Sequence, residues 1–318
     1  MMHFDVFNGD ADGLCALHQL RLVTPVESVL ITGVKRDIAL LQRAPALAGD
    51  RVTVLDVSAA TNRAALVALL ERGVEVEYFD HHYAGDLPVH PALRALIDPS
   101  PRVCTGVLVD RHLGGRQRVW AVVAAFGDNL REVATELAAQ LALDAGAIAQ
   151  LRELGESLAY NAYGDTEGDL IVHPATLYRT MAPYADPFRF IAGEALVQRI
   201  DEARREDLAR AMEASPAFAF DHARVYVLPD APWSRRVRGV LGNHRANEMP
   251  ALAHAILSPN EHGGYTVSVR APIARPAGAD ALCRAFATGG GRTSAAGIDD
   301  LPHDALTDFV QRMERAFR

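Results

Sequence analysis

The sequence has little lysine, little cysteine and no long apolar run. Lys35 is the only lysine among the 32 lysines and arginines. The three cysteines, Cys15, Cys104 and Cys283, are far apart and form no CxxC pair, which argues against a cysteine-based zinc site and against a disulfide framework. No apolar run is long enough to span a bilayer, and no signal peptide is recognisable. We therefore expect no membrane association and a cytoplasmic location.

The charge and the composition restrict the class of protein. A net charge of −8 argues against nonspecific binding to long nucleic acids, because their phosphates repel a negative protein. Arginine grips phosphate with two hydrogen bonds, but an excess of arginine over lysine more often reflects the composition of the genome. With 318 residues, of which 49% are apolar and 23% charged, the chain is expected to form two globular domains.

The first part of the chain alternates between predicted strands and predicted helices. Apolar runs predict strands over residues 3–7, 29–31, 51–55, 74–79 and 95–97. Helical patterns fill the intervals at residues 14–20, 37–44 and 61–72. Such alternation is typical of an α/β fold in which helices cover both faces of a parallel sheet.

The later part of the chain predicts a change of domain. Residues 104–163 are mainly helical in pattern, three prolines mark an irregular passage at 174–187, and a long charged helix is predicted over 191–212. That helix is the best linker candidate. Predicted strands at 223–228, 251–257 and 264–270, with a helix at 237–245, then indicate a smaller α/β domain. The predicted division is a metal-binding domain at 1–190, a helical linker at 191–217 and a second domain at 218–318.

Acidic residues and histidines follow the ends of predicted strands. The strand over 74–79 leads into Asp80, His81 and His82, and the strand over 51–55 leads into Asp56. In open α/β sheets, ligands bind at the carboxyl edge of the strands. An aspartate with two histidines suits metal ligation with one ring left for substrate. A surface turn with two solvated histidines would give the same short pattern.

Further carboxylates follow the first predicted strand and a buried helix. Asp10 and Asp12 stand in the turn into the first helix, and Asp128 follows the apolar run 120–126. An aspartate-rich helix N-cap is the simpler explanation of the first pair. A cap requires only one carboxylate, however, so we favour the hypothesis that both converge on an ion.

Together these residues make an oxygen-rich ligand set with one imidazole. Its members are Asp10, Asp12, Asp56, His81 and Asp128. Oxygen ligands with one imidazole suit Mn²⁺ or Mg²⁺ better than zinc. Without a cation, carboxylates about 5 Å apart would repel one another by roughly 3 kcal/mol per pair. Two divalent cations would balance the four negative charges, which indicates a binuclear site with Mn²⁺ expected ahead of Mg²⁺.

The sequence resembles the DHH family of phosphoesterases, which includes RecJ and oligoribonuclease-like enzymes. Its four N-terminal motifs match, in order, at Asp10-Ala11-Asp12-Gly13, Asp56, Asp80-His81-His82 and Asp128. Residues 267–270 and 289–292, with Ala295-Ala296-Gly297, resemble the C-terminal substrate-binding domain of that family. The resemblance covers nearly the whole chain. It implies an active site in the cleft between the two domains.

The resemblance implies a role for each metal ligand. Asp10 would serve one cation and Asp12 the other, with Asp56 bridging the two. His81 and Asp128 would complete the second site.

Catalytic and substrate-binding residues are implied in the same way. Asp80 would orient His81 from behind, and His82 would lie near the transferred phosphate. A phosphate of the substrate would be held by Arg270, Gly289, Gly290, Gly291 and Arg292.

The chain departs from the family pattern at three positions. Many members have histidine where Val6 stands, and RecJ-type members have aspartate where Asn8 stands. Asn8 can still coordinate a metal through its amide oxygen, but without charge. The nucleotide phosphatase branch usually has histidine after the three glycines, where this chain has Arg292.

We therefore expect a Mn²⁺-dependent phosphoesterase that hydrolyses short oligonucleotides or small nucleotides by a two-metal mechanism, as an exonuclease or oligoribonuclease. An inorganic pyrophosphatase or exopolyphosphatase is the first alternative, because the N-terminal motifs do not separate these activities. A non-catalytic nucleotide-binding module on the same fold is the second, and Asn8 is its only support.

Overall fold

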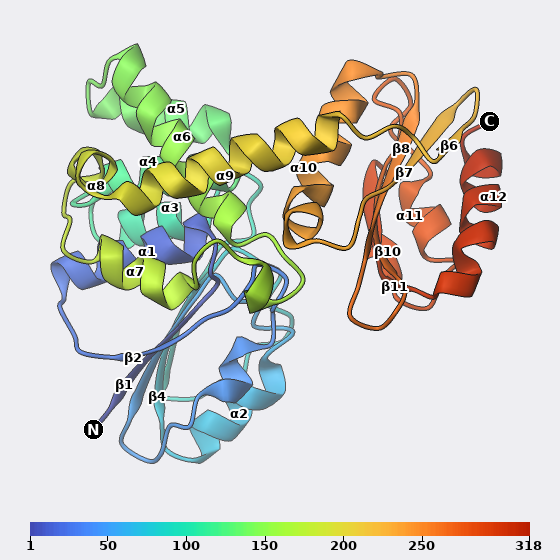
Figure 1. The fold of residues 1–318 in the computed structure, drawn as a ribbon. Coiled ribbons are helices and arrows are strands. Elements are labelled where there is room, and N and C mark those ends of the chain that lie inside the picture. Colours follow the sequence, from blue (N-terminus) through green and yellow to red (C-terminus); the bar gives the residue numbers. More distant parts are fainter. The chain divides into compact units, whose positions relative to one another are not determined.

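A five-stranded parallel sheet lies in the first of two units, in a computed structural model that describes residues 1–318 (Figure 1). The strands are β1 (His3–Phe7), β2 (Val29–Ile31), β3 (Arg51–Leu55), β4 (Glu75–Asp80) and β5 (Leu93–Ile97), in the order β2-β1-β3-β4-β5. Phe7 pairs with Leu55, and Leu55 pairs with Phe79. Because these last residues are in register, β1, β3 and β4 end at the same edge of the sheet.

Two hydrophobic cores cover the two faces of this sheet, because successive side chains of a strand point to opposite faces. Phe4 and Val6 of β1 belong to one core, with leucines of α2 (Arg63–Glu71) and of the 3₁₀ helix η1 (Leu40–Arg43). Phe7, at the end of the same strand, belongs to the other core, with α1 (Ala11–Val23). The α/β fold with helices on both faces of a parallel sheet is confirmed.

The second of these cores extends into a group of helices. They are α3 (Thr105–His112), α4 (Arg118–Gly127), α5 (Arg131–Gln140), α6 (Ala145–Asn161), α7 (Pro174–Met181) and α8 (Pro187–Gly193), with the 3₁₀ helix η2 (Glu167–Asp169). Residues 120–126 of α4 are all buried, which explains why this helix is apolar on every side. It packs against α1, α3, α5 and α6.

Prolines begin helices where the sequence predicted an irregular passage. Pro174 and Pro187 are the first residues of α7 and α8. Proline suits this position, because its fixed φ angle is helical and the first amide of a helix has no partner to lose. The helix predicted over 37–44 is only the short η1, and the long helix predicted from 191 begins at Ala195 instead.

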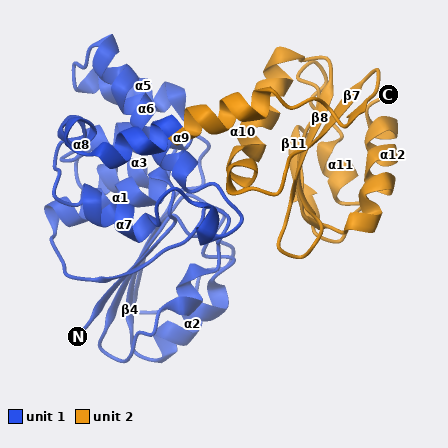
Figure 2. Ribbon diagram, viewed as in Figure 1, with its two compact units in different colours: residues 1–202 blue, residues 203–318 orange.

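The helix α9 (Ala195–Met212) contains the division between the two units, Met1–Glu202 and Ala203–Arg318 (Figure 2). Val197 and Ile200 belong to the core of the first unit. Ala211 belongs to a core of the second unit, with Tyr226 and Leu241. The domain boundaries expected after residues 190 and 217 stay a prediction.

The second unit has a mixed six-stranded sheet. Its order is β10-β11-β9-β8-β7-β6, with β6 (Phe218–Ala219), β7 (Ala223–Val227), β8 (Ala253–Pro259), β9 (Tyr265–Arg270), β10 (Gly289–Gly291) and β11 (Ala295–Leu301). Only β7 and β8 pair in parallel. Its helices are α10 (Pro232–Glu248), α11 (Ala279–Cys283), α12 (Leu306–Ala316) and the 3₁₀ helix η3 (His303–Ala305). The smaller α/β domain expected from the sequence has this architecture.

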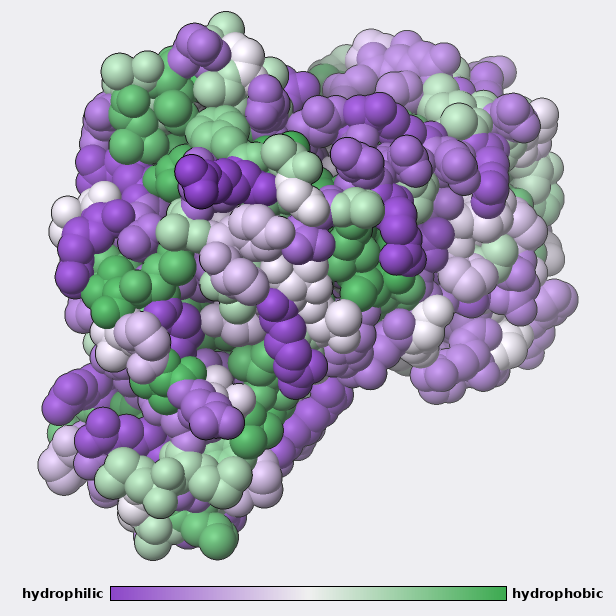
Figure 3. Space-filling view, turned by 60° about the vertical axis from the view of Figure 1, so that its left-hand side comes forward, coloured by the Kyte–Doolittle hydropathy of each residue, from purple (hydrophilic) through white to green (hydrophobic).

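The surface mixes polar and apolar residues. On the face drawn in Figure 3, hydrophobic areas are interrupted by hydrophilic ones. None of the helices combines the length and the apolar character that a membrane span requires.

We predict that Gly155→Ala destabilises the first unit, because Gly155 is where α6 touches α4. A Cβ at this position would lie 2.4 Å from the carbonyl oxygen of Val123 and 3.0 Å from the amide nitrogen of Gly127. Overpacking of this kind costs about 1–3 kcal/mol. Thermal unfolding followed by circular dichroism measures it. Gly168→Ala is the control, since its nearest neighbour would be Thr166 Oγ1 at 3.6 Å; equal melting temperatures for both variants would contradict the packing argument.

Candidate metal centre

The carboxyl edge of the parallel sheet gathers the predicted ligands from separate parts of the sequence. β1 is followed by Asn8, Asp10 and Asp12, β3 by Asp56, and β4 ends in Asp80, before His81 and His82. The three strands are neighbours, which brings their ends together. Asp128 joins them as the residue that ends α4.

Three carboxylates face the same imidazole nitrogen. The Nε2 atom of His81 lies 3.4 Å from Asp56 Oδ1, 3.9 Å from Asp12 Oδ2 and 4.0 Å from Asp128 Oδ2. The ligand atoms of Asp56, His81 and His82 also lie within 4.8 Å of one another. Asp12 and Asp56 are buried, whereas 22% of the Asp128 side chain is exposed. The arrangement is therefore a partly open pocket of oxygen and imidazole ligands.

The amino terminus of α3 positions Asp12, which the sequence did not predict. The amides of Thr105 and Gly106 donate to its two carboxylate oxygens, each at 2.7 Å. Thr105 Oγ1 also donates to Asp56 Oδ1 at 3.3 Å. Free amides at a helix start favour a negative group. They therefore hold the Asp12 carboxylate in a fixed orientation, ready to bind a cation.

The backbone of Asp56 is in the left-handed region, with φ at 58°. This conformation is uncommon for a residue other than glycine. The amide of Asp56 donates to the carbonyl of Phe79 at 3.0 Å, which ties the end of β3 to β4. The strained turn directs the carboxylate toward His81, and such strain is typical of functional sites.

The pKa values record the repulsion among these carboxylates. Burial, and then the charges of Asp12 and Asp10, raise the pKa of Asp56 well above its usual range. Burial and the charge of Asp12 raise the pKa of Asp128 to about 6. A cation among them would remove this penalty. Four carboxylates with one imidazole therefore fit a divalent cation such as Mn²⁺ or Mg²⁺.

The Asp10 carboxylate differs from the others, because a lysine binds it. Lys35 Nζ donates to Asp10 Oδ2 at 2.5 Å, and Asp10 Oδ1 caps α1 by accepting from the amides of Asp12 and Gly13. Although burial acts in the opposite direction, Lys35 lowers the pKa of Asp10. The side-chain amide of Asn8 makes both of its hydrogen bonds to backbone groups, with the carbonyl of Lys35 and the amide of Asp10. The sequence analysis did not predict Lys35 as a site residue, although Lys35 is the only lysine of the chain.

Asp80 orients His82, which corrects the sequence-based prediction that it orients the ring of His81. Asp80 Oδ1 lies 2.7 Å from His82 Nδ1 and accepts from the backbone amide of His81 at 2.9 Å. The ring of His81 instead faces the carboxylates, because it leaves β4 on the side of Asp56. The hydrogen bond from Asp80 raises the pKa of His82. Asp80 Oδ2 is buried and has no hydrogen-bond partner.

The three glycines that the resemblance assigns to a phosphate of the substrate lie in an edge strand of the second unit. Gly289, Gly290 and Gly291 form β10 and pair with β11. Position 289 requires glycine, because a Cβ there would lie 1.7 Å from the carbonyl oxygen of Cys283. Arg292 starts the turn into β11, where its backbone bonds with Ala295, and it is exposed.

Arg270 is near this turn, because it pairs with Ala295 across the sheet. Its guanidinium donates to Asn243 Oδ1 at 2.6 Å and to Ser268 Oγ at 2.8 Å. The structure thus brings Arg270 and the start of β11 together within the second unit.

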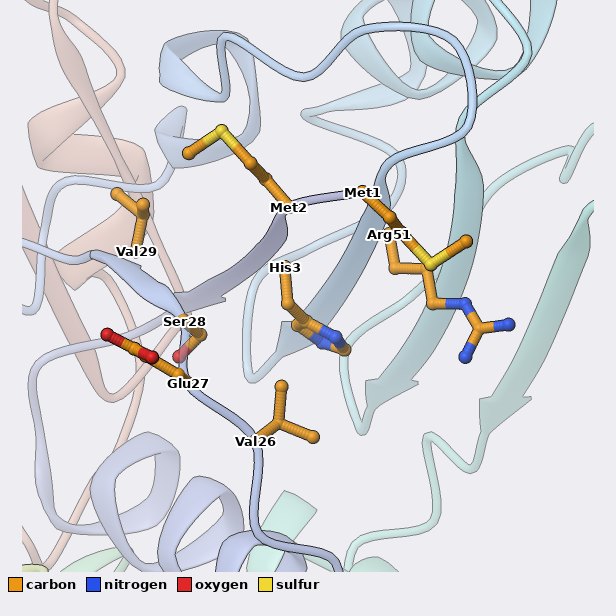
Figure 4. A pocket seen from close by; sticks show the side chains of 8 residues that line it. All are labelled: Met1, Met2, His3, Val26, Glu27, Ser28, Val29 and Arg51. Carbon is orange, nitrogen blue, oxygen red and sulfur yellow. The ribbon is translucent and has the colours of Figure 1, made fainter.

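The hollow drawn in Figure 4 lies at the opposite, amino edge of the parallel sheet. Its volume is about 460 Å³, and His3 and Arg51, the first residues of β1 and β3, line it. Glu27 is its only carboxylate. This hollow therefore lacks the carboxylate cluster that the carboxyl edge has.

We predict that the affinity for Mn²⁺ falls as the pH decreases through about 6, the pKa of Asp128. Below that pH the carboxyl is protonated and neutral, so a ligand charge is lost; above it, the carboxylate is ionised and binds. The pKa of Asp56 is raised as well, so its protonation should add to the loss of affinity in acid. Calorimetric titration with Mn²⁺ across this pH range measures the change. An affinity that is independent of pH would show that neither carboxyl binds the ion.

Solved structures of known proteins share this fold. No family model matches the sequence, and no curated protein is similar to it in sequence. A crystal structure of exonuclease RecJ bound to manganese has 18% identity and a TM-score of 0.64, over 99% of this chain and 89% of that chain. RecJ from Thermus thermophilus in complex with Mn²⁺ has 18% identity and a TM-score of 0.63, and this chain covers 51% of it.

A smaller protein matches from end to end. The pGpG-specific phosphodiesterase PggH from Vibrio cholerae has 13% identity and a TM-score of 0.53, over 98% of this chain and 99% of that chain. The resemblance to the DHH phosphoesterases that the motifs predicted is thus confirmed at the level of the fold, along nearly the whole chain.

Proposed function

We propose that the chain is a divalent-cation-dependent phosphoesterase that hydrolyses phosphate esters of small nucleotides or short oligonucleotides. The observation that carries this proposal is the meeting of Asp12, Asp56 and Asp128 around the Nε2 atom of His81, at 3.4–4.0 Å. The proteins of similar fold support it, since they include an exonuclease solved with manganese and a phosphodiesterase specific for pGpG. The three free, buried cysteines fit the cytoplasmic location that we propose.

The cation would be held by Asp12, Asp56, His81 and Asp128, with Mn²⁺ preferred over Mg²⁺ because of the imidazole. When bound, such a cation neutralises charge on phosphoryl oxygens and lowers the pKa of water. The charge of the four carboxylates led us to expect two cations, and the resemblance would give the other one to Asp10.

His82 is the proposed proton donor. Its pKa is raised by the hydrogen bond to Asp80, and 44% of its side chain is exposed, so a substrate can reach it. A protonated imidazole next to the scissile ester would donate its proton to the leaving oxygen. Asp80, which is buried, would fix the ring and favour its protonated form.

Arg270, Arg292 and the glycine strand Gly289–Gly291 are the proposed contacts for a second phosphate of the substrate. The Arg292 side chain is exposed, so a phosphate group can reach it. A planar guanidinium suits two phosphate oxygens.

A non-catalytic nucleotide-binding module is the competing function, and Lys35 is the observation that favours it. An ammonium 2.5 Å from Asp10 partly neutralises the cluster without any metal. Hydrolysis of inorganic pyrophosphate or polyphosphate is the remaining alternative within the enzyme class. A panel of dinucleotides, short oligonucleotides, pyrophosphate and polyphosphate, with Mn²⁺, Mg²⁺ or no metal, separates the three. Binding without turnover of any member would establish the module.

We predict that Asp56→Ala lowers turnover of the best substrate by about a hundredfold or more, since preorganised charge at a phosphoryl site contributes at least that much. Steady-state kinetics in saturating Mn²⁺ measures the loss. The matched control is Asp98→Ala, because Asp98 follows β5 at the same sheet edge but pairs with Ser100 and Arg111 instead. If the two variants retained equal activity while folded, the carboxylate cluster would not be the active site.

Arg292→Ala should mainly raise KM for substrates that carry a second phosphate away from the scissile one. A charge-assisted contact contributes roughly 1.5–3 kcal/mol, which corresponds to about tenfold or more in KM. A minimal ester such as bis-p-nitrophenyl phosphate has no second phosphate and should lose much less. Arg312→Ala, an exposed arginine of α12 paired with Asp308, is the control. Equal losses on both substrates would assign Arg292 to the stability of the fold.

A further inference from the structure

Both carboxylate oxygens of Asp10 accept hydrogen bonds from donors of the protein itself. Its Oδ1 atom accepts from the amides of Asp12 at 3.0 Å and Gly13 at 3.2 Å. Its Oδ2 atom accepts from Lys35 Nζ at 2.5 Å. Asp10 is 3% exposed, so water contributes little. The carboxylate that the resemblance would give to the first cation is thus already paired with a positive charge.

Asn8 holds the lysine in place instead of offering an oxygen to a metal. Its Nδ2 atom donates to the carbonyl of Lys35 at 3.2 Å, and its Oδ1 atom accepts from the amide of Asp10 at 3.2 Å. The amide of Lys35 donates to the carbonyl of Ala162 at 2.9 Å. An aspartate at position 8 has no hydrogen to donate to the Lys35 carbonyl. Asparagine at position 8 therefore supports lysine at position 35, because its side chain holds the backbone of that residue.

The identity of residue 35 is also informative. Arginine supplies every other strongly basic side chain of the chain, since Lys35 is the only lysine among the 32 lysines and arginines. A compositional bias that favours arginine elsewhere does not explain a lysine here. Lysine carries a compact point charge, whereas the arginine fork is planar and broad. A compact charge is what a position next to one buried carboxylate oxygen accommodates.

Asp128 separates the centre into two halves. Its Oδ1 atom lies 3.9 Å from Lys35 Nζ, and its Oδ2 atom lies 4.0 Å from His81 Nε2. On the His81 side, Asp12 and Asp56 complete a ligand set. On the Lys35 side, a divalent ion bound to Asp10 would share a carboxylate with an ammonium group, and like charges so close together repel.

We propose that the Lys35 ammonium takes the place of one of the two cations, so that the centre binds a single divalent ion at Asp12, Asp56, His81 and Asp128. This inference rests on the metal dependence in the proposed function and revises the number of ions expected from the sequence. Lys35 would supply a fixed positive charge for the phosphoryl group at any metal concentration. Activity would then depend on the binding of one ion and not on two.

Calorimetric titration of the metal-free protein with Mn²⁺, in the absence of substrate, tests the proposal. We expect one ion per chain for the natural sequence, and an electron paramagnetic resonance spectrum without spin coupling between ions. The double variant Asn8→Asp with Lys35→Ala should bind two, because it removes the ammonium and adds a carboxylate. Lys35→Met alone should lose the charge but gain no ligand. Arg36→Ala is the control, since Arg36 is the adjacent basic residue and pairs with Asp165; it should bind one.

Two ions bound by the natural sequence, or none, would overturn the inference. If the double variant does not fold, as checked by its circular dichroism, the count for the natural sequence still decides. A double variant that folds and binds one ion would show that Lys35 and Asn8 do not set the number. Because no substrate is present, the result is independent of turnover. One bound ion without hydrolysis of any substrate would refute the proposed function and leave this inference standing.

Discussion

Repulsion between carboxylates gathered at one sheet edge is the constraint on which the rest of the structure depends. Asp10, Asp12, Asp56 and Asp128 carry charges of the same sign into a mostly buried region. The fold offsets part of this cost with donors: the start of α1 at Asp10 and the start of α3 at Asp12. The remainder appears as raised pKa values of Asp56 and Asp128. The centre is therefore stable only to the extent that positive charge is supplied to it.

The scaffold around the centre is rigid enough to hold the carboxylates together despite their repulsion. Parallel strands in register fix the ends of β1, β3 and β4, and the wholly buried α4 fixes Asp128. The left-handed backbone of Asp56 persists because its amide is bonded to β4 and its carboxylate to Thr105. Strain of this kind costs of order 1–3 kcal/mol and is retained only where the surroundings determine it. Packing energy thus sustains a geometry that the local sequence would not adopt alone.

The sequence predicted the sheet from the local pattern of apolar residues. It predicted the strand-end ligands because the carboxyl ends of parallel strands meet at one edge of the sheet. Contacts between distant segments had no such signal: Lys35 reaches Asp10, and the amides of Thr105 and Gly106 reach Asp12, across loops of unpredictable path. The resemblance assigned Asp80 to the ring of His81, whereas Asp80 lies against His82, because alternation along a strand does not determine the direction of side chains after it ends. The strand β10 was not predicted, because glycine composition does not reveal pairing with β11. The roles of the site residues and the domain boundaries stay predictions.

Lys35 has a consequence for the chemical reactivity of the protein. A chain with one lysine has one side-chain amine, and 39% of the Lys35 side chain is exposed. Although burial acts in the opposite direction, Asp10 raises the pKa of this amine, so it stays protonated and reacts slowly with acylating reagents. Acylation removes the positive charge, which would leave Asp10 without its partner. The ion pair with Asp10 thus also shields the single lysine of the chain from acetylation and from other reagents that attack neutral amines.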